Sequence, residues 1–406
     1  MAYKNLVLIR NGSIDDETES IPLHQLKHSD SRLFMHNPLF PPRDSSENLQ
    51  LVWVLTGDKA GDRSQLMGLV EALGRPFEEK RLQFNKRYKK SNLRLAHSLQ
   101  SLDIARSAAL QPPWPDLVLA SGRRAVPVAR WIKRQTKGHA KLVHIGRPWA
   151  PLSLFDLVVS TAQYQLPARP NVVTNVFTLN RIDPERLASA KARWGPVFSA
   201  YSRPLIGVLV GGATRPFLFD SAAASALGQA AGDMARSLGG TLLVSTSPRT
   251  GKDATEALFA NLPDSAFRQS FQAEGHNPYL GIIGLADRFI VTGDSASMLS
   301  EACLSGKPVH VFPMPERPDL RMRLSRKMRT ICLGSDGNAG GALAKAYELL
   351  IASGITAQAT RDMRLFHQAL EKGGWIRSLT DLSSPPMLRP RDELALTVNR
   401  VRALYY

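Results

Sequence analysis

Short, mainly apolar segments recur along this chain, and several end in small or polar residues before a helical pattern begins. Residues 51–56 (LVWVLT) precede GDKAGDRSQ and the helical pattern LMGLVEALG, and residues 115–122 (PDLVLASG) run into VPVARWIKRQTKG. The segments KLVHIG, 156–161 and NVVTNVFT continue the series. A strand that is apolar on both faces is buried on both faces, so the pattern predicts a parallel sheet covered by helices on both sides.

The same pattern restarts in the second half of the chain. Residues 183–203 contain Pro184 and Pro196 and are predicted to connect two domains. After them come PLIGVLVGG, an alanine-rich helix over 220–238, TLLVSTS, a helix near 254–261, RFIVTG, SMLSEACLSG and PVHVF. We therefore expect an α/β fold with two Rossmann-like units. The predicted division is an N-terminal extension over 1–50, domains over 51–190 and 200–350, and C-terminal helices over 351–406 that pack back on the first domain.

The charge of the chain is strongly positive and is concentrated in one region. Lys and Arg number 52 against 35 Asp and Glu, a net charge of +17, and residues 75–147 hold 17 basic and 4 acidic residues. This favours a polyanionic partner (nucleic acid, an anionic membrane surface or a phosphorylated substrate) over a merely solvated basic face. The stretch KRLQFNKRYKK over 80–90 suits an interfacial segment or single-strand nucleic-acid binding. Because no recognised nucleic-acid motif accompanies the charge, we expect no nucleic-acid partner and favour the membrane surface.

The cysteines and the apolar stretches indicate where such a chain works. Cys303 and Cys332 are too few for a disulfide framework and are expected to be free thiols in a reducing compartment. Apolar stretches such as residues 205–212 are far shorter than the roughly 18 residues of a membrane span, and the N-terminus does not read as an export signal. We therefore expect a cytoplasmic protein that is peripheral on the inner face of the membrane.

Two polar loops follow apolar strands of the first unit, at the strand ends where open parallel sheets bind ligands. In GDKAGD, glycines allow close backbone approach, helix amides favour an anion, and Asp58 or Asp62 can take a proton from a hydroxyl. The alternative is that Asp62 or Ser64 caps the following helix. In SGRR, Arg123 and Arg124 either clamp a phosphate or are surface arginines at a helix start.

Three loops of the second unit offer small residues and one cation at the same kind of strand end. They are GGAT, STSPRTG with Arg249, and TGDSASMLSE. In the third loop Glu301 follows Ser297 by four residues, on the same helical face. Amides and serines at that helix start suit a pyrophosphate, and the carboxylate one turn later can accept both hydroxyls of a ribose. The competing interpretation is a capping box of Ser297 with Ser300 or Glu301.

These motifs together resemble a known family. VWVLTGDKAGDRSQLMGLVEALG, PDLVLASGRRAVPVAR, LVGGATRPFLFD, STSPRTG and above all NPYLGIIGLADRFIVTGDSASMLSEACLSGKPVHVF resemble the mitochondrial-fission "elongated mitochondria" family over about residues 51–313. Its bacterial members are regarded as glycosyltransferases of lipooligosaccharide core assembly. The resemblance implies a GT-B-like fold, in which two Rossmann-like domains face a cleft, with the acceptor on the first and the nucleotide-sugar on the second. The 294–301 region is also similar to the donor loop of the lipid-linked N-acetylglucosaminyltransferase of peptidoglycan synthesis, where a glutamate at the place of Glu301 holds the ribose.

The chain departs from the family at three places. Asp62 stands where the family usually has histidine, although GDKAGD also resembles a loop of lipid A disaccharide synthase. Ile145-Gly146-Arg147-Pro148 replaces an Asp-Pro-Arg motif, and Gln163-Tyr164 replaces His-Asp. These differences indicate a divergent member with its own acceptor.

Residues and resemblance together predict a metal-independent glycosyltransferase acting on a lipid-linked or lipopolysaccharide-core acceptor, with a nucleotide-diphosphate sugar, a UDP-sugar favoured, as co-substrate and no cofactor. Asp62, or failing that Asp58, would deprotonate the acceptor, while Arg249 and helix amides would stabilise the departing diphosphate. The alternative function is a non-enzymatic peripheral membrane adaptor that retains the fold. The expected acceptor-binding residues are Lys59, Gly61, Gln65, Ser121, Gly122, Arg123 and Arg124. The expected donor-binding residues are Gly211, Gly212, Thr214, Ser245, Ser247, Arg249, Thr250, Asn277, Tyr279, Asp294, Ser295, Ser297, Met298 and Glu301.

Overall fold

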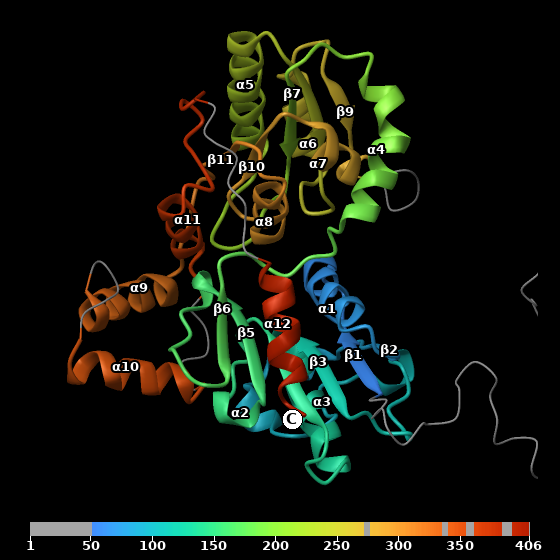
Figure 1. Cartoon of the computed structure of the whole chain (residues 1–406). Coiled ribbons are helices and arrows are strands. Elements are labelled where there is room, and N and C mark those ends of the chain that lie inside the picture. The colour runs from blue at the N-terminus through green and yellow to red at the C-terminus, as the bar shows by residue number, and fades with distance from the viewer. Residues whose placement is uncertain (1–50, 272–276, 335–339, 355–360, 384–391, 406) are drawn as a thin grey trace, which may run out of the picture. The chain divides into compact units, whose positions relative to one another are not determined.

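Two parallel sheets form the framework of the chain in its computed structural model (Figure 1). The structure describes residues 51–271, 277–334, 340–354, 361–383 and 392–405, so the predicted N-terminal extension lies outside the described residues. The first sheet has the order β2-β1-β3-β4-β5-β6, and all of its neighbouring strands pair in parallel. Its strands are β1 (Val52–Thr56), β2 (Phe77–Arg81), β3 (Leu117–Ser121), β4 (Lys141–Ile145), β5 (Leu157–Thr161) and β6 (Val172–Asn175).

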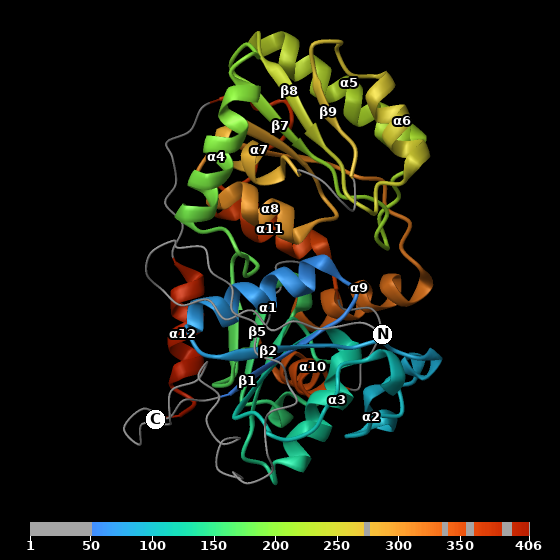
Figure 2. The same ribbon diagram turned by 90° about the vertical axis from the view of Figure 1, so that its right-hand side faces the viewer.

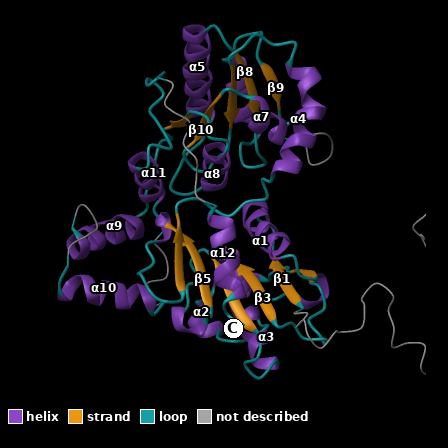
Figure 3. Ribbon diagram, viewed as in Figure 1, coloured by secondary structure: helices purple, strands orange, loops and turns teal. Residues whose placement is uncertain are grey.

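Each face of the first sheet has its own apolar core, as the strand pattern predicts. Trp53, Leu55 and Val118 pack on the face of α3, and Val52 and Val54 pack on the face of α1, where α12 adds Val398 and Val401. Figure 3 shows these helices on either side of the strands. The helices of this part of the chain are α1 (Ala60–Leu73), α2 (Asn92–Leu95), α3 (Gly122–Gln135) and α12 (Glu393–Arg402).

The second sheet has the order β11-β10-β7-β8-β9 and is also wholly parallel. One large core spans it, and α5 contacts α6 while α4 contacts α7 (Figure 2). Its strands are β7 (Leu205–Leu209), β8 (Thr241–Ser245), β9 (Phe267–Gln269), β10 (Arg288–Thr292) and β11 (Val309–Phe312). The helices of this part are α4 (Pro184–Phe198), α5 (Ser221–Leu238), α6 (Lys252–Ala260), α7 (Tyr279–Leu285), α8 (Ala296–Leu304) and α11 (Met363–Lys372). The α/β class with two parallel sheets is confirmed.

Two segments contain regular structure that the sequence pattern did not predict. The segment 183–203 does connect the two sheets, but it contains the helix α4. Asp183 accepts a bond from the Arg186 amide, and Pro184 stands at the first helical position, where its missing N–H costs nothing. The segment 80–90 divides between the end of β2 and a 3-10 turn at Lys86–Lys89, and its interfacial role stays a prediction. The predicted domain bounds stay a prediction.

Two further helices, α9 (Leu320–Leu333) and α10 (Ala342–Ala352), follow the second sheet and contact each other. No helix of the described part of the chain is both long and apolar enough to cross a bilayer.

Each sheet has one point where the strand order reverses. In the first sheet β1 lies between β2 and β3, and in the second β7 lies between β8 and β10. Loops on either side of such a point leave the sheet in opposite directions, which opens a crevice at the carboxyl ends of the strands. The predicted loops follow β1 and β3 in the first sheet, and β7, β8 and β10 in the second. We call these positions the first and second switch points.

Candidate functional site

Asp294 joins the three loops of the second switch point. Its fully buried carboxylate accepts bonds from the Gly212 amide at 3.2 Å, the Thr292 hydroxyl at 2.8 Å and Arg249 Nη2 at 2.9 Å. Thr292 in turn accepts from the Gly211 amide at 2.8 Å. Burial raises the pKa of Asp294 above its ordinary value, although Arg249 and the hydroxyl of Thr292 act against that change. The predicted donor residues Gly212, Arg249 and Asp294 therefore meet at one point.

Gly211 and Gly212 of this switch point lie too close to neighbouring atoms to carry a side chain. A Cβ on Gly211 would lie 2.3 Å from Oδ1 of Asp294, and one on Gly212 would lie 2.2 Å from the carbonyl oxygen of Arg249. Real Cβ atoms do not approach other atoms so closely, so any side chain would force the loops apart. The chain after β7 therefore follows a path that only glycine permits.

Ser247 and Thr250 hold the loop after β8 against the loop after β7. The hydroxyls of both donate to the carbonyl of Gly211, that of Thr250 at 2.7 Å, and the Ser247 amide donates to Thr250 Oγ1 at 3.0 Å. Ser245 is buried as the last residue of β8, and the Thr214 carbonyl accepts from the Phe217 amide at 2.9 Å in the turn that follows β7. The hydroxyls of Ser247 and Thr250 shape the loops, because they already donate hydrogen bonds within the chain.

The start of α8 is capped by Ser295, whose side chain accepts from the amide of Met298, a half-buried residue. The alternative cap on Ser297 is wrong, since Ser300 instead accepts from the Thr178 amide at 2.9 Å. Ser297 is half-buried, and its hydroxyl lies 3.3 Å from a Cβ built on Gly61 at the start of α1.

Glu301 and Tyr279 form the buried acidic end of the second switch point. The Tyr279 hydroxyl donates to the Glu301 carboxylate, and burial raises the pKa of Glu301 to about 7. Burial raises the pKa of Tyr279 as well. Asn277 Oδ1 accepts from the Tyr279 amide at 2.9 Å and so fixes the start of α7. Among the described residues, one tyrosine hydroxyl donates to this buried carboxylate, which therefore has capacity for further hydroxyl donors.

The polar groups of the first switch point make fewer hydrogen bonds to neighbouring loops than those of the second. The exposed residue Lys59 stands at the cap position of α1 with no side-chain cap, so the alternative in which Asp62 or Ser64 caps this helix is wrong. Asp62 lies in the first turn of α1, where the helix dipole favours a carboxylate. Its Oδ2 atom lies 3.1 Å from a Cβ built on Gly122. Burial raises the pKa of Tyr164, Arg361 acts against that change, and the charge of Asp62 adds to it.

The two arginines after β3 turn toward the 3-10 segment. Arg123 Nη2 donates to the Tyr88 carbonyl at 2.6 Å, and burial lowers the pKa of Arg123. The Arg124 guanidinium lies 3.9 Å above the Tyr88 ring and 3.9 Å from Oδ2 of Asp58. Both arginines thus have partners within the chain. Two other predicted polar residues also bond within the chain. Ser121 Oγ donates to the carbonyl of Ile145 at 3.2 Å, and Gln65 Nε2 donates to the carbonyl of Gly61 at 3.4 Å.

One residue near the second switch point escaped sequence analysis. His367 of α11 lies with Nε2 2.8 Å from the carbonyl of Gly293, so it borders the loop that carries Asp294. The two residues are 74 positions apart, and nothing near His367 in the sequence marks it. Within the described residues no group of three or more His, Cys, Asp or Glu side chains is placed to hold a metal ion.

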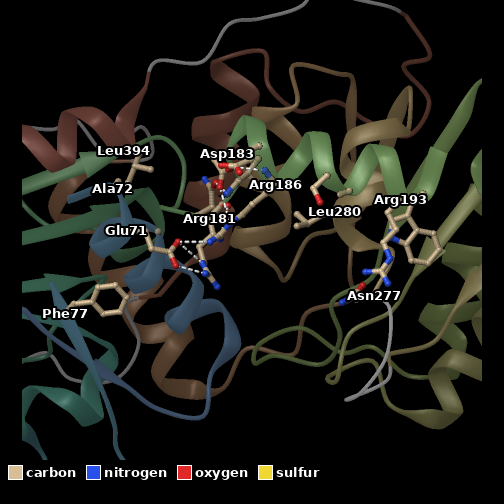
Figure 4. A pocket seen from close by; sticks show the side chains of 17 residues that line it. Glu71, Ala72, Phe77, Arg181, Asp183, Arg186, Arg193, Asn277, Leu280 and Leu394 are labelled. Atoms are coloured by element: carbon tan, nitrogen blue, oxygen red, sulfur yellow. Dashed lines mark hydrogen bonds and ion pairs between the residues drawn. The ribbon is translucent and has the colours of Figure 1, made fainter. Parts of the chain in front are cut away.

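A cavity of about 950 Å³ opens between α1 and α4 (Figure 4). Glu71 accepts there from Arg181 at 2.5 Å and from Arg186 at 3.1 Å. Of the predicted site residues, Asn277 lines this cavity. Because the cavity lies beside the second half of α1 and not at the strand ends, we place the candidate site at the two switch points.

Among solved structures, the UDP-GlcNAc 2-epimerase from Methanocaldococcus jannaschii is 13% identical, with a TM-score of 0.44 over 87% of this chain and 99% of that one. A glycosyltransferase from Rickettsia africae ESF-5 is 13% identical, with a TM-score of 0.37 over 83% of this chain and 100% of that one. Both alignments extend over most of this chain.

Two sequence relatives give closer matches. The mitochondrial fission protein ELM1 of Arabidopsis thaliana is 28% identical over 219 residues, which cover 48% of this chain and 51% of that protein. The match therefore spans about half the length of the Arabidopsis protein. The uncharacterized protein RP120 of Rickettsia prowazekii (strain Madrid E) is 24% identical over 307 residues, 67% of this chain and 86% of that protein. The family model described as mitochondrial fission ELM1 matches residues 60–331, more than half of the chain, and the chain therefore belongs to the mitochondrial fission ELM1 family.

Proposed function

We propose that this protein is a glycosyltransferase that moves a sugar from a nucleotide-diphosphate sugar to a lipid-linked or lipopolysaccharide-core acceptor. The observation that carries the proposal is the second switch point, where Asp294 joins the loops after β7, β8 and β10. Arg249 bonds to Asp294 just before α8 begins, and Glu301 lies one turn further along that helix. The family and the α/β fold are consistent with this function. They leave donor and acceptor open.

The donor fits the second switch point by charge. Arg249 keeps one bond to Asp294, while its side chain is 48% exposed, so the guanidinium can also face an anion. The amides at the start of α8 present partial positive charge in the same region. We propose that the diphosphate lies there and that the Glu301 carboxylate accepts the ribose hydroxyls, with Tyr279 yielding or sharing its bond.

The reaction that we propose needs one base and one stabilised leaving group. The acceptor hydroxyl oxygen bonds to the anomeric carbon, the bond from that carbon to the diphosphate oxygen breaks, and the nucleoside diphosphate leaves with the electron pair. The hydroxyl proton passes to the carboxylate of Asp62. Arg249 and the α8 amides stabilise the negative charge of the leaving group, without a metal ion. Asp58 is the alternative base, and it is the more exposed of the two carboxylates.

The acceptor would bind at the first switch point, next to the basic region over 75–147. A phosphorylated or lipid-linked glycan is anionic, and 17 basic residues against 4 acidic ones favour such a molecule. We propose that the reaction takes place at the cytoplasmic face of a membrane.

Calorimetric titration with UDP, GDP, CMP and ADP, each with and without EDTA, tests the proposal. We expect saturable binding of one nucleotide that EDTA does not change, with UDP favoured. Glu301→Ala should weaken that binding about 10- to 100-fold, because hydrogen bonds to a charged group are strong. The control is Glu256→Ala on α6, whose exposed side chain pairs with Lys252 of the same helix.

The outcomes separate the two candidate functions. Equal affinity in Glu301→Ala and wild type would remove Glu301 from the site. Binding of no nucleotide at all would reject the transferase and favour a non-enzymatic membrane adaptor with the same fold.

A further inference from the structure

We propose that helix α9 is a docking surface for an anionic lipid bilayer. The described part of this helix contains no buried residue. Leu320, Leu324, Met328 and Ile331 are each between 52% and 70% exposed, and their spacing of four, four and three residues places them on one face. An apolar stripe of this length facing outward is unusual for a helix packed on a soluble domain.

The orientation of α9 is fixed by charge on its inner face. The largely buried Arg326 side chain bonds to Glu316 at 2.8 Å and to Asp362 at 3.2 Å. Arg326 lies on the opposite side of the helix from the apolar stripe. The usual arrangement is therefore inverted, since a paired cation points inward and leucine, methionine and isoleucine point outward.

Charge identifies the partner. The helix has five basic residues and no acidic one, and the exposed residues Arg321, Arg323 and Lys327 flank the apolar stripe. An apolar stripe bordered by cations matches the boundary between lipid headgroups and acyl chains of an anionic leaflet. A second copy of the helix would bring like charges together, which disfavours self-association through this face.

Helix α10 lies next to α9 and contacts it (Figure 1). Its Leu343 and Leu349 are also exposed. The apolar stripe and the cations of α9 lie outside the basic region over 75–147, so the two sets of residues can be changed independently. The proposal does not depend on the transferase function.

Flotation of the full-length protein with vesicles tests the proposal. The vesicles are phosphatidylcholine alone, or phosphatidylcholine with about 30% phosphatidylglycerol, which supplies the negative surface potential. We expect wild type to float with the anionic vesicles and to dissociate as salt rises. The double variant Leu324→Ser, Met328→Ser should lower the partition coefficient at least about tenfold, because each loses apolar area buried in the interface.

The charge of α9 is tested in parallel. Arg321→Glu with Lys327→Glu should lower partitioning at least about twentyfold, since each basic residue near an anionic leaflet contributes about fivefold. The matched controls are Ile104→Ser, an exposed apolar residue elsewhere, and Lys191→Glu with Lys372→Glu, which replace exposed lysines of α4 and α11. Both controls should keep nearly wild-type flotation.

Several results would overturn the proposal. They are failure of wild type to bind any vesicle, equal flotation of the α9 variants and wild type, or loss of flotation in the Lys191/Lys372 control alone. A change of oligomeric state in the α9 variants without vesicle binding would show that a second copy covers the face. The proposal would also be rejected if residues 1–50 cover this face. In that case wild type would not float, and residues 1–50 would be cleaved faster by protease in the α9 variants than in wild type.

A fluorescent label gives a readout that does not rely on a disruptive variant. An environment-sensitive dye on Met328→Cys, in a Cys332→Ser background, should shift to shorter wavelength with anionic vesicles. The same dye on Ile104→Cys in that background should not shift. Identical spectra with and without vesicles at Met328→Cys would contradict insertion of α9.

Discussion

The two switch points have the same topology but differ in how far their polar groups are already bonded. At the second, Asp294, Thr292, Ser247 and Thr250 all bond to backbone or side chains of neighbouring loops, and two glycines are fixed by close approach. At the first, the helix α1 has no side-chain cap, and Asp58 and Lys59 are exposed. A preformed site suits a ligand of constant shape such as a nucleotide, whereas a less bonded site can adapt to its ligand.

The largest expected effect comes from the base at the less bonded switch point. Asp62→Asn should lower turnover about 100- to 10,000-fold, the usual contribution of general base catalysis, and should leave nucleotide affinity unchanged. Release of the nucleoside diphosphate from the donor identified by calorimetry is the measurement. Asp58→Asn is the matched control and should retain most activity. Loss in Asp58→Asn with retention in Asp62→Asn would exchange their roles, and retention in both would place the base elsewhere.

The pH dependence of stability should differ in sign between the two regions. Burial raises the pKa of Glu301 from 4.5 to about 7 in the folded chain, so its contribution to stability is full below pH 4.5 and is lost as pH rises toward 7. The bond from Arg63 lowers the pKa of Glu79, beside β1, to about 2, so that contribution is present above pH 4.5 and is lost as pH falls toward 2.

Urea unfolding at pH 5 and pH 8 measures the Glu301 effect. From pH 5 to pH 8 the free energy of unfolding of wild type should fall by up to about 3 kcal/mol more than that of Glu301→Gln. If the ionised carboxylate binds the ribose, nucleotide affinity should also be roughly tenfold weaker at pH 6 than at pH 8. A wild-type profile parallel to that of Glu301→Gln would mean that Glu301 ionises at its ordinary pKa.

Replacing a glycine by alanine should affect stability differently at the two switch points. Gly211→Ala places a Cβ 2.3 Å from Asp294 Oδ1, and the strain should lower the free energy of unfolding by about 1–3 kcal/mol and weaken nucleotide binding. In Gly57→Ala the new Cβ meets Phe84 at an ordinary 3.7 Å, so the change should stay within about 0.5 kcal/mol. Urea unfolding of both variants is the test, and equal losses would show that the second switch point is as adaptable as the first.

Sequence patterns predicted the apolar strands, most helices and the glycine-rich loops because each depends on residues close together in the chain. The charged strand β2 (FEEKR) and the three-residue strand β9 (FRQ) were not predicted, since neither has an apolar run. The helix α4 escaped because Pro184 and Pro196 read as breakers, although a proline at the first helical position is compatible with a helix. His367 escaped because its contact with Gly293 joins residues that are distant in sequence. The bond between Tyr279 and Glu301 likewise depends on how α7 packs against α8, which no local pattern records. Prediction was therefore strongest for backbone loops and weakest for side chains that reach them from elsewhere.

The smallest expected effect concerns Arg124 at the first switch point. Its contacts with Asp58 and Tyr88 are partly exposed, so Arg124→Ala should change the free energy of unfolding by less than about 1 kcal/mol. If Arg124 also holds an anionic acceptor, the variant should raise the KM for acceptor while the affinity for nucleotide stays constant, and Arg124→Lys should recover part of that loss. Steady-state kinetics at two salt concentrations measure the KM for acceptor in Arg124→Ala and in Arg124→Lys. A KM unchanged by Arg124→Ala would mean that this arginine only holds the 3-10 segment against α3, and the adaptable character of the first switch point would then rest on its uncapped helix and exposed carboxylates.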